Sequence, residues 1–157
     1  MTGICLSVVT VIAGHASAAS AGSGCFVRDG VIDSVATYKY TDVPPAGPSV
    51  GDSETVTENI YYPAGTQVGT DSGTIVITNK ASNGDLWAAS HVVFKVFGGV
   101  IDAYGYADLT AELEGGSTSV YAIGVSGPFA GKVGTISWVD TSQTTADATY
   151  TLCAPAS

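Results

Sequence analysis

Residues 86–110 read LWAASHVVFKVFGGVIDAYGYADLT and contain two runs in which apolar and small or polar residues alternate. In the first run, every second residue from Ser90 to Val96 shares one side of an extended chain, and Trp87, His91 and Lys95 share the other. Alternation with a period of two predicts β-strands. The glycine pair at 98–99 favours a turn between the two runs. The segment therefore predicts two neighbouring antiparallel strands.

The same pattern continues through the rest of the chain and predicts an all-β protein. The sequence has 19 Val, 18 Thr and 20 Gly but only 5 Leu, a composition that favours strands and turns over helices. The predicted strands are 35–42, 54–62, 68–78, 86–97, 99–110, 118–125, 132–140 and 144–153. Closing eight such strands into an antiparallel β-barrel would remove both sheet edges. A barrel of this size can hold one small ligand, and its mixture of small and aromatic residues predicts a central apolar cavity.

Length and charge exclude several classes of protein. The chain has 157 residues, which suits one domain, and a net charge of −9 with a single arginine. This acidic balance excludes a surface that follows nucleic-acid phosphates. Only 12% of the residues are charged and 45% are hydrophobic, so the chain is not of the disordered class.

The first 21 residues differ from the remainder. The apolar run Ile4–Ala13 is followed by small residues that offer cleavage sites near residues 18 and 21. This is typical of a signal peptide, and the run is too short to span a bilayer as a helix, so no stable membrane insertion is expected. The positive charge usual at the start of a signal is missing. Two interpretations stay open: a secreted protein with its leader cleaved, or a cytoplasmic protein that keeps residues 1–21 as a lid over the 25–157 barrel.

Cleavage would leave two cysteines, Cys25 and Cys153, near the ends of the mature chain. In an oxidising compartment we expect them to form a disulfide that closes the domain end to end. The alternative is a pair of unlinked cysteines. Neither residue has the spacing of a zinc or CxxC redox motif, so no metal site is expected from them.

Residues 122–134, AIGVSGPFAGKVG, resemble the characteristic segment of the allene oxide cyclase and dirigent superfamily. Residues 68–73 (VGTDSG) and 99–105 (GVIDAYG) are similar to earlier strands of the same family and follow in the same order. In character the chain is most similar to the bacterial branch that contains spirotetronate-type polyketide cyclases. The resemblance implies a small barrel with a hydrophobic small-molecule substrate, and a homodimer or homotrimer.

This resemblance implies a cofactor-independent cyclase that folds a linear polyene or polyketide and promotes an intramolecular [4+2] cyclisation of the Diels–Alder type. Such a reaction needs ordering of the substrate and a donor to a carbonyl, without a nucleophile, metal or redox group. We assign Tyr121 as the phenol donor, and Trp138 as a catalytic residue that supplies shape and an indole N–H. The predicted cavity residues are Phe94, Tyr104, Tyr106, Tyr38, Ile136 and Ile123.

Other interpretations remain for the same residues. The aromatic side chains could simply pack a filled barrel of purely structural function. The protein could also be a secreted, non-catalytic barrel that binds a hydrophobic ligand, or a dirigent-like protein that orients a radical made by another enzyme. His91 is expected on a strand surface, and Glu112 and Glu114 at a solvated hairpin end. Asp102 shares its strand face with Tyr104, so the two would form an internal network only if that face points inward.

Overall fold

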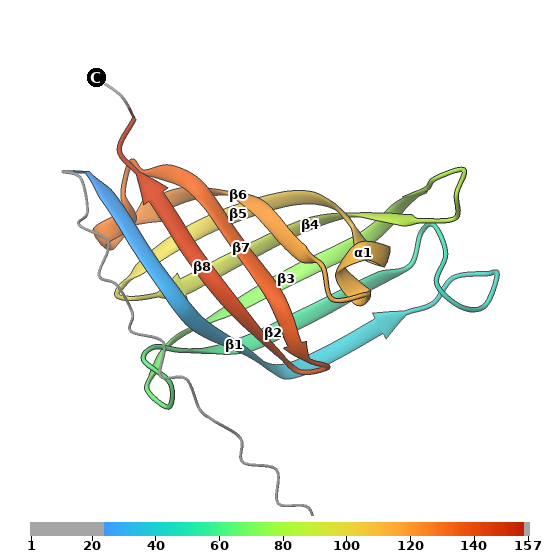
Figure 1. Cartoon of the computed structure of the whole chain (residues 1–157), viewed down its shortest axis with the longest axis horizontal. Coiled ribbons are helices and arrows are strands. Elements are labelled where there is room, and N and C mark those ends of the chain that lie inside the picture. The colour runs from blue at the N-terminus through green and yellow to red at the C-terminus, as the bar shows by residue number, and fades with distance from the viewer. Residues whose placement is uncertain (1–23, 156–157) are drawn as a thin grey trace, which may run out of the picture.

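The computed structural model describes residues 24–155, and they form a closed barrel of eight antiparallel strands (Figure 1). Each strand pairs with the next along the chain, and β8 closes the barrel by pairing with β1. The predicted leader at residues 1–21 lies outside the described residues. The strands are β1 (Cys25–Thr41), β2 (Ser53–Tyr61), β3 (Gln67–Lys80), β4 (Leu86–Val96), β5 (Gly99–Asp108), β6 (Ser117–Ser126), β7 (Val133–Ser142) and β8 (Thr145–Cys153).

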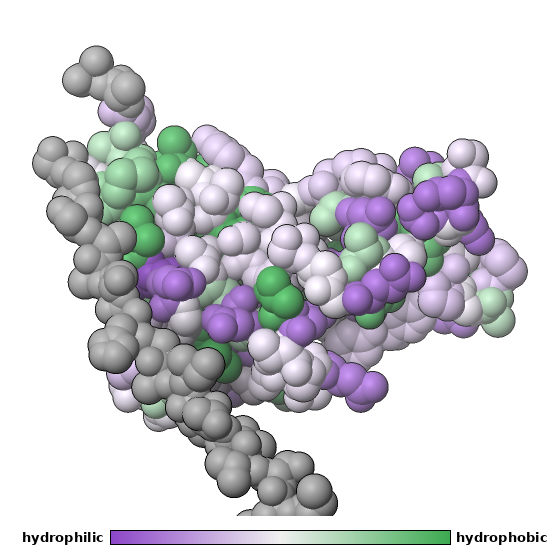
Figure 2. Space-filling view, in the orientation of Figure 1, coloured by the Kyte–Doolittle hydropathy of each residue, from purple (hydrophilic) through white to green (hydrophobic). Residues whose placement is uncertain are grey.

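Alternation along each strand separates an inner from an outer face. In β6 the residues from Ser117 to Val125 are exposed and buried in strict turn, and β8 shows the same two-residue period. Because successive side chains point to opposite sides of a sheet, each strand contributes one row to the interior. The all-β barrel expected from the sequence is therefore confirmed. On the outside, hydrophobic residues are scattered among hydrophilic and neutral ones in the view of Figure 2.

Two short helices accompany the strands, and the first departs from a predicted strand. Residues 109–110, predicted as the end of a strand, begin helix α1 (Leu109–Leu113). The Asp108 side chain accepts a hydrogen bond from the Ala111 backbone N–H and so caps this helix. The second helix is the 3₁₀ turn η1 (Gly127–Phe129), between β6 and β7. Among the described residues, no helix is long and apolar enough to span a membrane.

Aromatic side chains fill one end of the barrel. The Phe26 ring packs 4.7 Å from that of Phe129 and 5.4 Å from that of Phe97, centroid to centroid. Phe97 in turn contacts Tyr62 and Tyr150 edge to face. These rings belong to the largest group of buried apolar residues or pack directly against it. We call this end the plugged end, because these rings fill the interior there.

The Cys25–Cys153 disulfide lies at the plugged end and joins the start of β1 to the end of β8. These two residues are also direct partners in the β1–β8 register. The expected end-to-end closure of the barrel domain by this disulfide is present in the structure.

Close approach of the backbone requires glycine at two positions near η1. A Cβ atom on Gly124 would collide with the Phe129 backbone, and one on Gly134 would collide with the Thr151 carbonyl of β8. Both glycines belong to the motif at 122–134. The motif therefore shapes the plugged end, and the chemistry must be sought at the other end.

The other end, which we call the open end, carries α1 and the β1–β2 and β3–β4 connections (Figure 1). Asp52 holds the long β1–β2 connection in place. Its carboxylate accepts hydrogen bonds from the Tyr40 hydroxyl at 2.5 Å and from the Val43 and Ser49 backbone N–H groups, each at 2.8 Å. These bonds, that of Tyr40 foremost, lower the pKa of Asp52, and the same contact raises the pKa of Tyr40 to about 12. The connection is thus fixed at the rim of the open end.

Candidate active site

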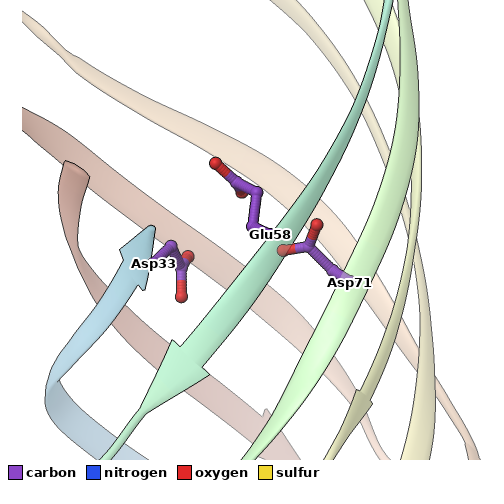
Figure 3. Close-up of side chains that lie close together, drawn as sticks. All are labelled: Asp33, Glu58 and Asp71. Atoms are coloured by element: carbon purple, nitrogen blue, oxygen red, sulfur yellow. The ribbon is translucent and has the colours of Figure 1, made fainter. Parts of the chain in front are cut away.

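Three acidic side chains converge inside the barrel wall from neighbouring strands (Figure 3). Asp33 comes from β1, Glu58 from β2 and Asp71 from β3. Glu58 and Asp71 are direct partners in the β2–β3 register, which places the two carboxyl groups side by side. One oxygen of each of the three residues lies within 4.8 Å of the others. We call these residues the deep cluster.

The deep cluster is buried and short of hydrogen-bond partners. Asp33 is 5% exposed and Asp71 is 4% exposed. Asp33 Oδ1, both Asp71 carboxyl oxygens and the Tyr150 hydroxyl are buried and have no partner. Among the described residues these four atoms are the complete set of buried unpartnered side-chain polar atoms. Their gathering at one place indicates a site built to interact with something further, since buried polar atoms are normally paired.

Burial changes the charge of the deep cluster. Desolvation, followed by the negative charge of Glu58, raises the pKa of Asp33 to about 8. The same causes raise the pKa of Asp71 well above its usual range, and burial raises the pKa of Glu58. Desolvation also raises the pKa of Tyr150, whose hydroxyl faces Asp33. At neutral pH, Asp33 and Asp71 are therefore held as neutral acids that can donate a hydrogen bond. The spacing of the oxygens would also suit a hard cation in place of the protons.

Asp33 and Glu58 open into a chamber of about 160 Å3 inside the barrel. Five of its twelve lining residues are acidic. The complete lining is Asp33, Glu54, Val56, Glu58, Ile75, Ser90, Val92, Phe94, Glu112, Trp138, Asp140 and Ala146. The central cavity was expected to be apolar. Six of the twelve lining residues are apolar, and inward positions of β1, β2 and β7 together with helix α1 add five carboxyl groups.

Three of these carboxylates lie toward the open end, and we call them the entrance trio. Glu54 comes from β2, Glu112 from α1 and Asp140 from β7. Burial, and then repulsion from the other two members, raises the pKa of Glu54. Partial desolvation, followed by repulsion from Glu112, raises the pKa of Asp140, which remains exposed to solvent. The Trp138 Nε1–H donates a hydrogen bond to Glu112 Oε1 at 2.9 Å and ties α1 to β7.

A second, apolar space of about 420 Å3 lies at the open end, and we call it the mouth. Glu54 lines both the mouth and the chamber, and a space of about 20 Å3 between them is also bounded by Glu54. The mouth is lined by Tyr38, Tyr40, Pro48, Glu54, Ile77, Leu109 and Leu113. The site therefore has an apolar outer part and an acidic inner part, with Glu54 at the junction.

The allene oxide cyclase barrel-like domain model matches residues 32–151, most of the chain. The chain belongs to this family. The suspected superfamily is thereby confirmed, and the matched region contains every residue of the chamber and of the mouth.

Several solved structures share the barrel of this allene oxide cyclase-like chain. AbnU, described as an exo-specific intermolecular Diels-Alderase, has a TM-score of 0.75 at 22% identity, over 82% of this chain and 96% of that one. A nonspecific heme-binding cyclase of [4+2] cycloaddition in neoabyssomicin biosynthesis has a TM-score of 0.76 at 22% identity, over 85% and 66%. A pyocyanin demethylase has a TM-score of 0.66 at 19% identity, over 82% and 97%. No curated protein sequence matches the chain. At these identities the likeness shows the fold.

Four of the predicted site residues lie in or beside the internal space of this family barrel. Trp138 and Phe94 line the chamber, and Tyr38 lines the mouth. Ile136 is fully buried in the core. The role of Trp138 needs one correction: its indole N–H, expected to face the substrate, is donated to Glu112. Trp138 therefore shapes the chamber and positions Glu112.

The other four predicted residues lie on the outer face, and their expected place in the cavity is wrong. Tyr121 is 50% exposed and Tyr106 is 55% exposed, while Tyr104 and Ile123 are also exposed. The two-residue period groups residues by face, but it does not say which face is inside. In β5 and β6 the smaller residues point inward, and the aromatic row points outward.

The expected Asp–Tyr pairing does occur, but on the outer face. Asp102 accepts a hydrogen bond from the Tyr104 hydroxyl at 2.7 Å and lies 2.7 Å from His91 Nε2. These two bonds, that of Tyr104 first, lower the pKa of Asp102. His91 also stacks on Tyr104, so its predicted surface position is confirmed. This cluster is separated from the chamber by the barrel wall.

The sequence interpretation missed the acidic interior. Glu112, expected at a solvated hairpin end, lies on α1 and lines the chamber. A signal was present in β2: Glu54 and Glu58 share the face of Ile60, which is fully buried. Two carboxylates in register with a core residue indicate a polar interior site.

We expect the stability of the protein to fall as the pH rises from 5 to 8. Asp33 and Asp71 have higher pKa values in the folded than in the unfolded state, so folding takes up protons in this range. Stability is then greatest at low pH and is lost as the pH approaches the folded pKa, about 8 for Asp33. A loss of about 2 kcal/mol or more is expected. Urea denaturation at both pH values measures it.

Asp71→Asn should reduce this pH dependence, because the amide cannot lose a proton. Asp29→Asn makes the same change of side chain at an exposed position of β1 and should leave the dependence intact. Equal unfolding free energies at pH 5 and pH 8 in the unaltered protein would contradict the assignment of neutral acids to the deep cluster.

Proposed function

We propose that this barrel is a cofactor-independent cyclase. It takes a hydrophobic linear polyene or polyketide through the mouth and promotes an intramolecular [4+2] cyclisation, with Asp33 as hydrogen-bond donor to a carbonyl on the dienophile. One observation carries this proposal: a neutral acid with an unpartnered carboxyl oxygen lies deep in a chamber that shares Glu54 with an apolar mouth. The sequence suggested Tyr121 as the hydrogen-bond donor. We propose Asp33 in this role instead, because Tyr121 is on the outer face.

The proposed reaction requires two things of the protein: a shaped site that orders the substrate and a hydrogen-bond donor. A [4+2] cyclisation forms two σ bonds from two π bonds, and no atom or electron leaves the substrate. Holding diene and dienophile in a near-attack arrangement can lower the barrier by up to about 7–11 kcal/mol. A hydrogen bond from Asp33 to the dienophile carbonyl withdraws electron density and stabilises the charge that develops on the oxygen. Such a bond is stronger in a buried site than in water.

The dimensions of the site restrict how a substrate can bind. The chamber of about 160 Å3 is smaller than the roughly 300–1,000 Å3 of ordinary ligand pockets. A polyene would therefore place its carbonyl end in the chamber and the rest of its carbon chain in the mouth of about 420 Å3. Trp138 and Phe94 then provide rigid walls against which the reacting end folds.

The similar solved structures support this proposal, since two of the three are described as catalysts of Diels–Alder or [4+2] reactions. The pyocyanin demethylase has the same fold and a different activity. Fold alone therefore does not assign the chemistry, and turnover must be measured.

The proposal is tested with synthetic linear polyenes that carry a conjugated ketone as the dienophile. We expect faster formation of the cyclic product with the protein than in buffer. Trp138→Ala should lower the acceleration by about tenfold or more, because it removes a wall of the chamber and the bond that holds Glu112. Tyr121→Phe is the matched control on the outer face and should have no effect. Product formation is followed by chromatography.

Two outcomes would overturn the cyclase proposal. Tight binding of the polyene without acceleration would indicate a non-catalytic barrel that carries a hydrophobic ligand. Product that forms only with an added oxidase would indicate a dirigent-like role.

A further inference from the structure

The entrance trio is a group of negative side chains without a positive partner. Glu54, Glu112 and Asp140 face one another between the mouth and the deep cluster, close enough for mutual repulsion. None of the residues that line the chamber or the mouth is Lys, Arg or His. The donors to the trio are neutral: the Trp138 indole donates to Glu112, and a side-chain hydrogen bond from Tyr38 partly offsets the rise in the pKa of Glu54. Glu54 and Glu112 are half-buried and Asp140 is exposed, and a bound cation would reduce the repulsion among the three.

A second observation also points to a ligand in this chamber. Asp33 lines it, is only 5% exposed, and has a carboxyl oxygen without any hydrogen-bond partner. The Tyr150 hydroxyl is fully buried and is likewise unpartnered. The wall of the chamber therefore carries an unsatisfied polar atom on Asp33, which a bound polar group would satisfy.

We infer that the substrate of this barrel carries a protonated amine, which binds at the entrance trio beside Trp138 while its hydrocarbon part occupies the mouth. This inference rests on the proposed function, because it assigns the substrate class of the same cavity. The entrance trio lies nearer the mouth than the deep cluster does. An amine bound at the trio therefore leaves Asp33 able to donate a hydrogen bond to the carbonyl.

The chemistry of an ammonium group fits the site. It has three hydrogen-bond donors and no acceptor, whereas the trio offers only carboxyl groups around one space. A cation near an indole ring is further stabilised by the negative face of the ring. A carboxylate ligand would be repelled, and an alcohol would leave the negative charge of the trio unbalanced. The apolar mouth provides the surface for the attached carbon chain.

Hexylamine and 1-hexanol are suitable probes, because they share one carbon chain and differ in the polar group. Isothermal titration calorimetry at pH 7 should show hexylamine binding at least about tenfold more tightly, since hydrogen bonds to charged groups exceed neutral ones by roughly this factor.

The double variant Glu54→Gln/Asp140→Asn should lose the preference for the amine. Asp29→Asn removes a negative charge from the outer face and should keep the preference. Circular dichroism and a thermal melt establish that each variant is folded. Equal affinity for the two probes in the unaltered protein would overturn the inference. A preference that survives in the double variant would also overturn it, because attraction by the overall net charge of −9 would then explain the result.

A failure of this inference can be separated from a failure of the cyclase proposal. Amine-selective binding without turnover of any polyene, amine-bearing or neutral, would reject the cyclase and keep the ligand class. Turnover of neutral polyenes at the rate of amine-bearing ones, with no amine preference in calorimetry, would keep the cyclase and reject the ligand class.

Discussion

Replacing Asp33 with leucine is expected to lower the rate of cyclisation by about 10²-fold, the usual effect of removing a hydrogen-bond donor from a buried reaction centre. Asp33 is the one member of the deep cluster that both lines the chamber and has a carboxyl oxygen without a partner. Leucine is of similar size and has no donor, so it removes the hydrogen bond and largely preserves the shape of the site.

Asp33→Asn should behave differently, because the amide keeps an N–H donor. We expect it to retain much of the activity and to change the dependence on pH. In the unaltered protein the acid must be protonated to donate, and its pKa is raised to about 8 by burial. The rate should therefore be constant below this pH and fall as the pH rises through it. In Asp33→Asn the alkaline fall should disappear.

These variants are compared by measuring the rate of product formation from pH 6 to pH 9.5. A thermal melt at each pH keeps loss of folding separate from loss of activity. If Asp33→Leu cyclises the polyene as fast as the unaltered protein, Asp33 has no part in the reaction. An alkaline fall that persists in Asp33→Asn would assign the titration to another group.

Removing the disulfide is expected to have the largest effect on stability. Cys25 and Cys153 are 128 residues apart, so their bond closes almost the entire barrel. In the chain-entropy model, opening a loop of this length costs about 4–5 kcal/mol. For a domain of this size that corresponds to a fall in Tm of roughly 10 °C or more. Scanning calorimetry of Cys25→Ser/Cys153→Ser measures it.

The same calorimetry includes its own control. A reducing agent should lower the Tm of the unaltered protein and leave that of the double variant unchanged. An unaltered protein whose Tm does not respond to reduction would contradict the prediction. A disulfide that closes the domain is typical of oxidising compartments, and it supports the proposal that the chain is exported.

The fold could be predicted from the sequence to a large extent, because it depends on local patterns. The alternation in residues 86–97 marks β4, with Val92, Phe94 and Val96 inside and His91 outside as expected. Residues 109–110 share the alternation of β5 and are predicted as its end. They instead begin helix α1, because the side chain of Asp108 caps a helix at this point. Strand β1 begins at Cys25, before the first predicted strand. Cys25 lies opposite Cys153 because β1 and β8 pair when the barrel closes.

The candidate site could be predicted only in part. Trp138 and Phe94 line the chamber, and the family pattern or the row of apolar neighbours indicated this inward position. Tyr121 was assigned to the interior for its chemistry, and it lies on the outer face. Asp33, Glu54 and Asp71 were not singled out, because an acidic residue on a strand usually faces solvent.

The amino-acid sequence alone determined one acidic, all-β domain of eight strands, and the cysteine pair that closes it. These properties follow from composition and from a two-residue period, both of which are local. Only the tertiary structure decided which face of each strand lies inside, and so placed five carboxyl groups among the apolar residues of the chamber behind the apolar mouth. The physical reason is that burial depends on how all eight strands close together, and burial makes Asp33 a neutral donor.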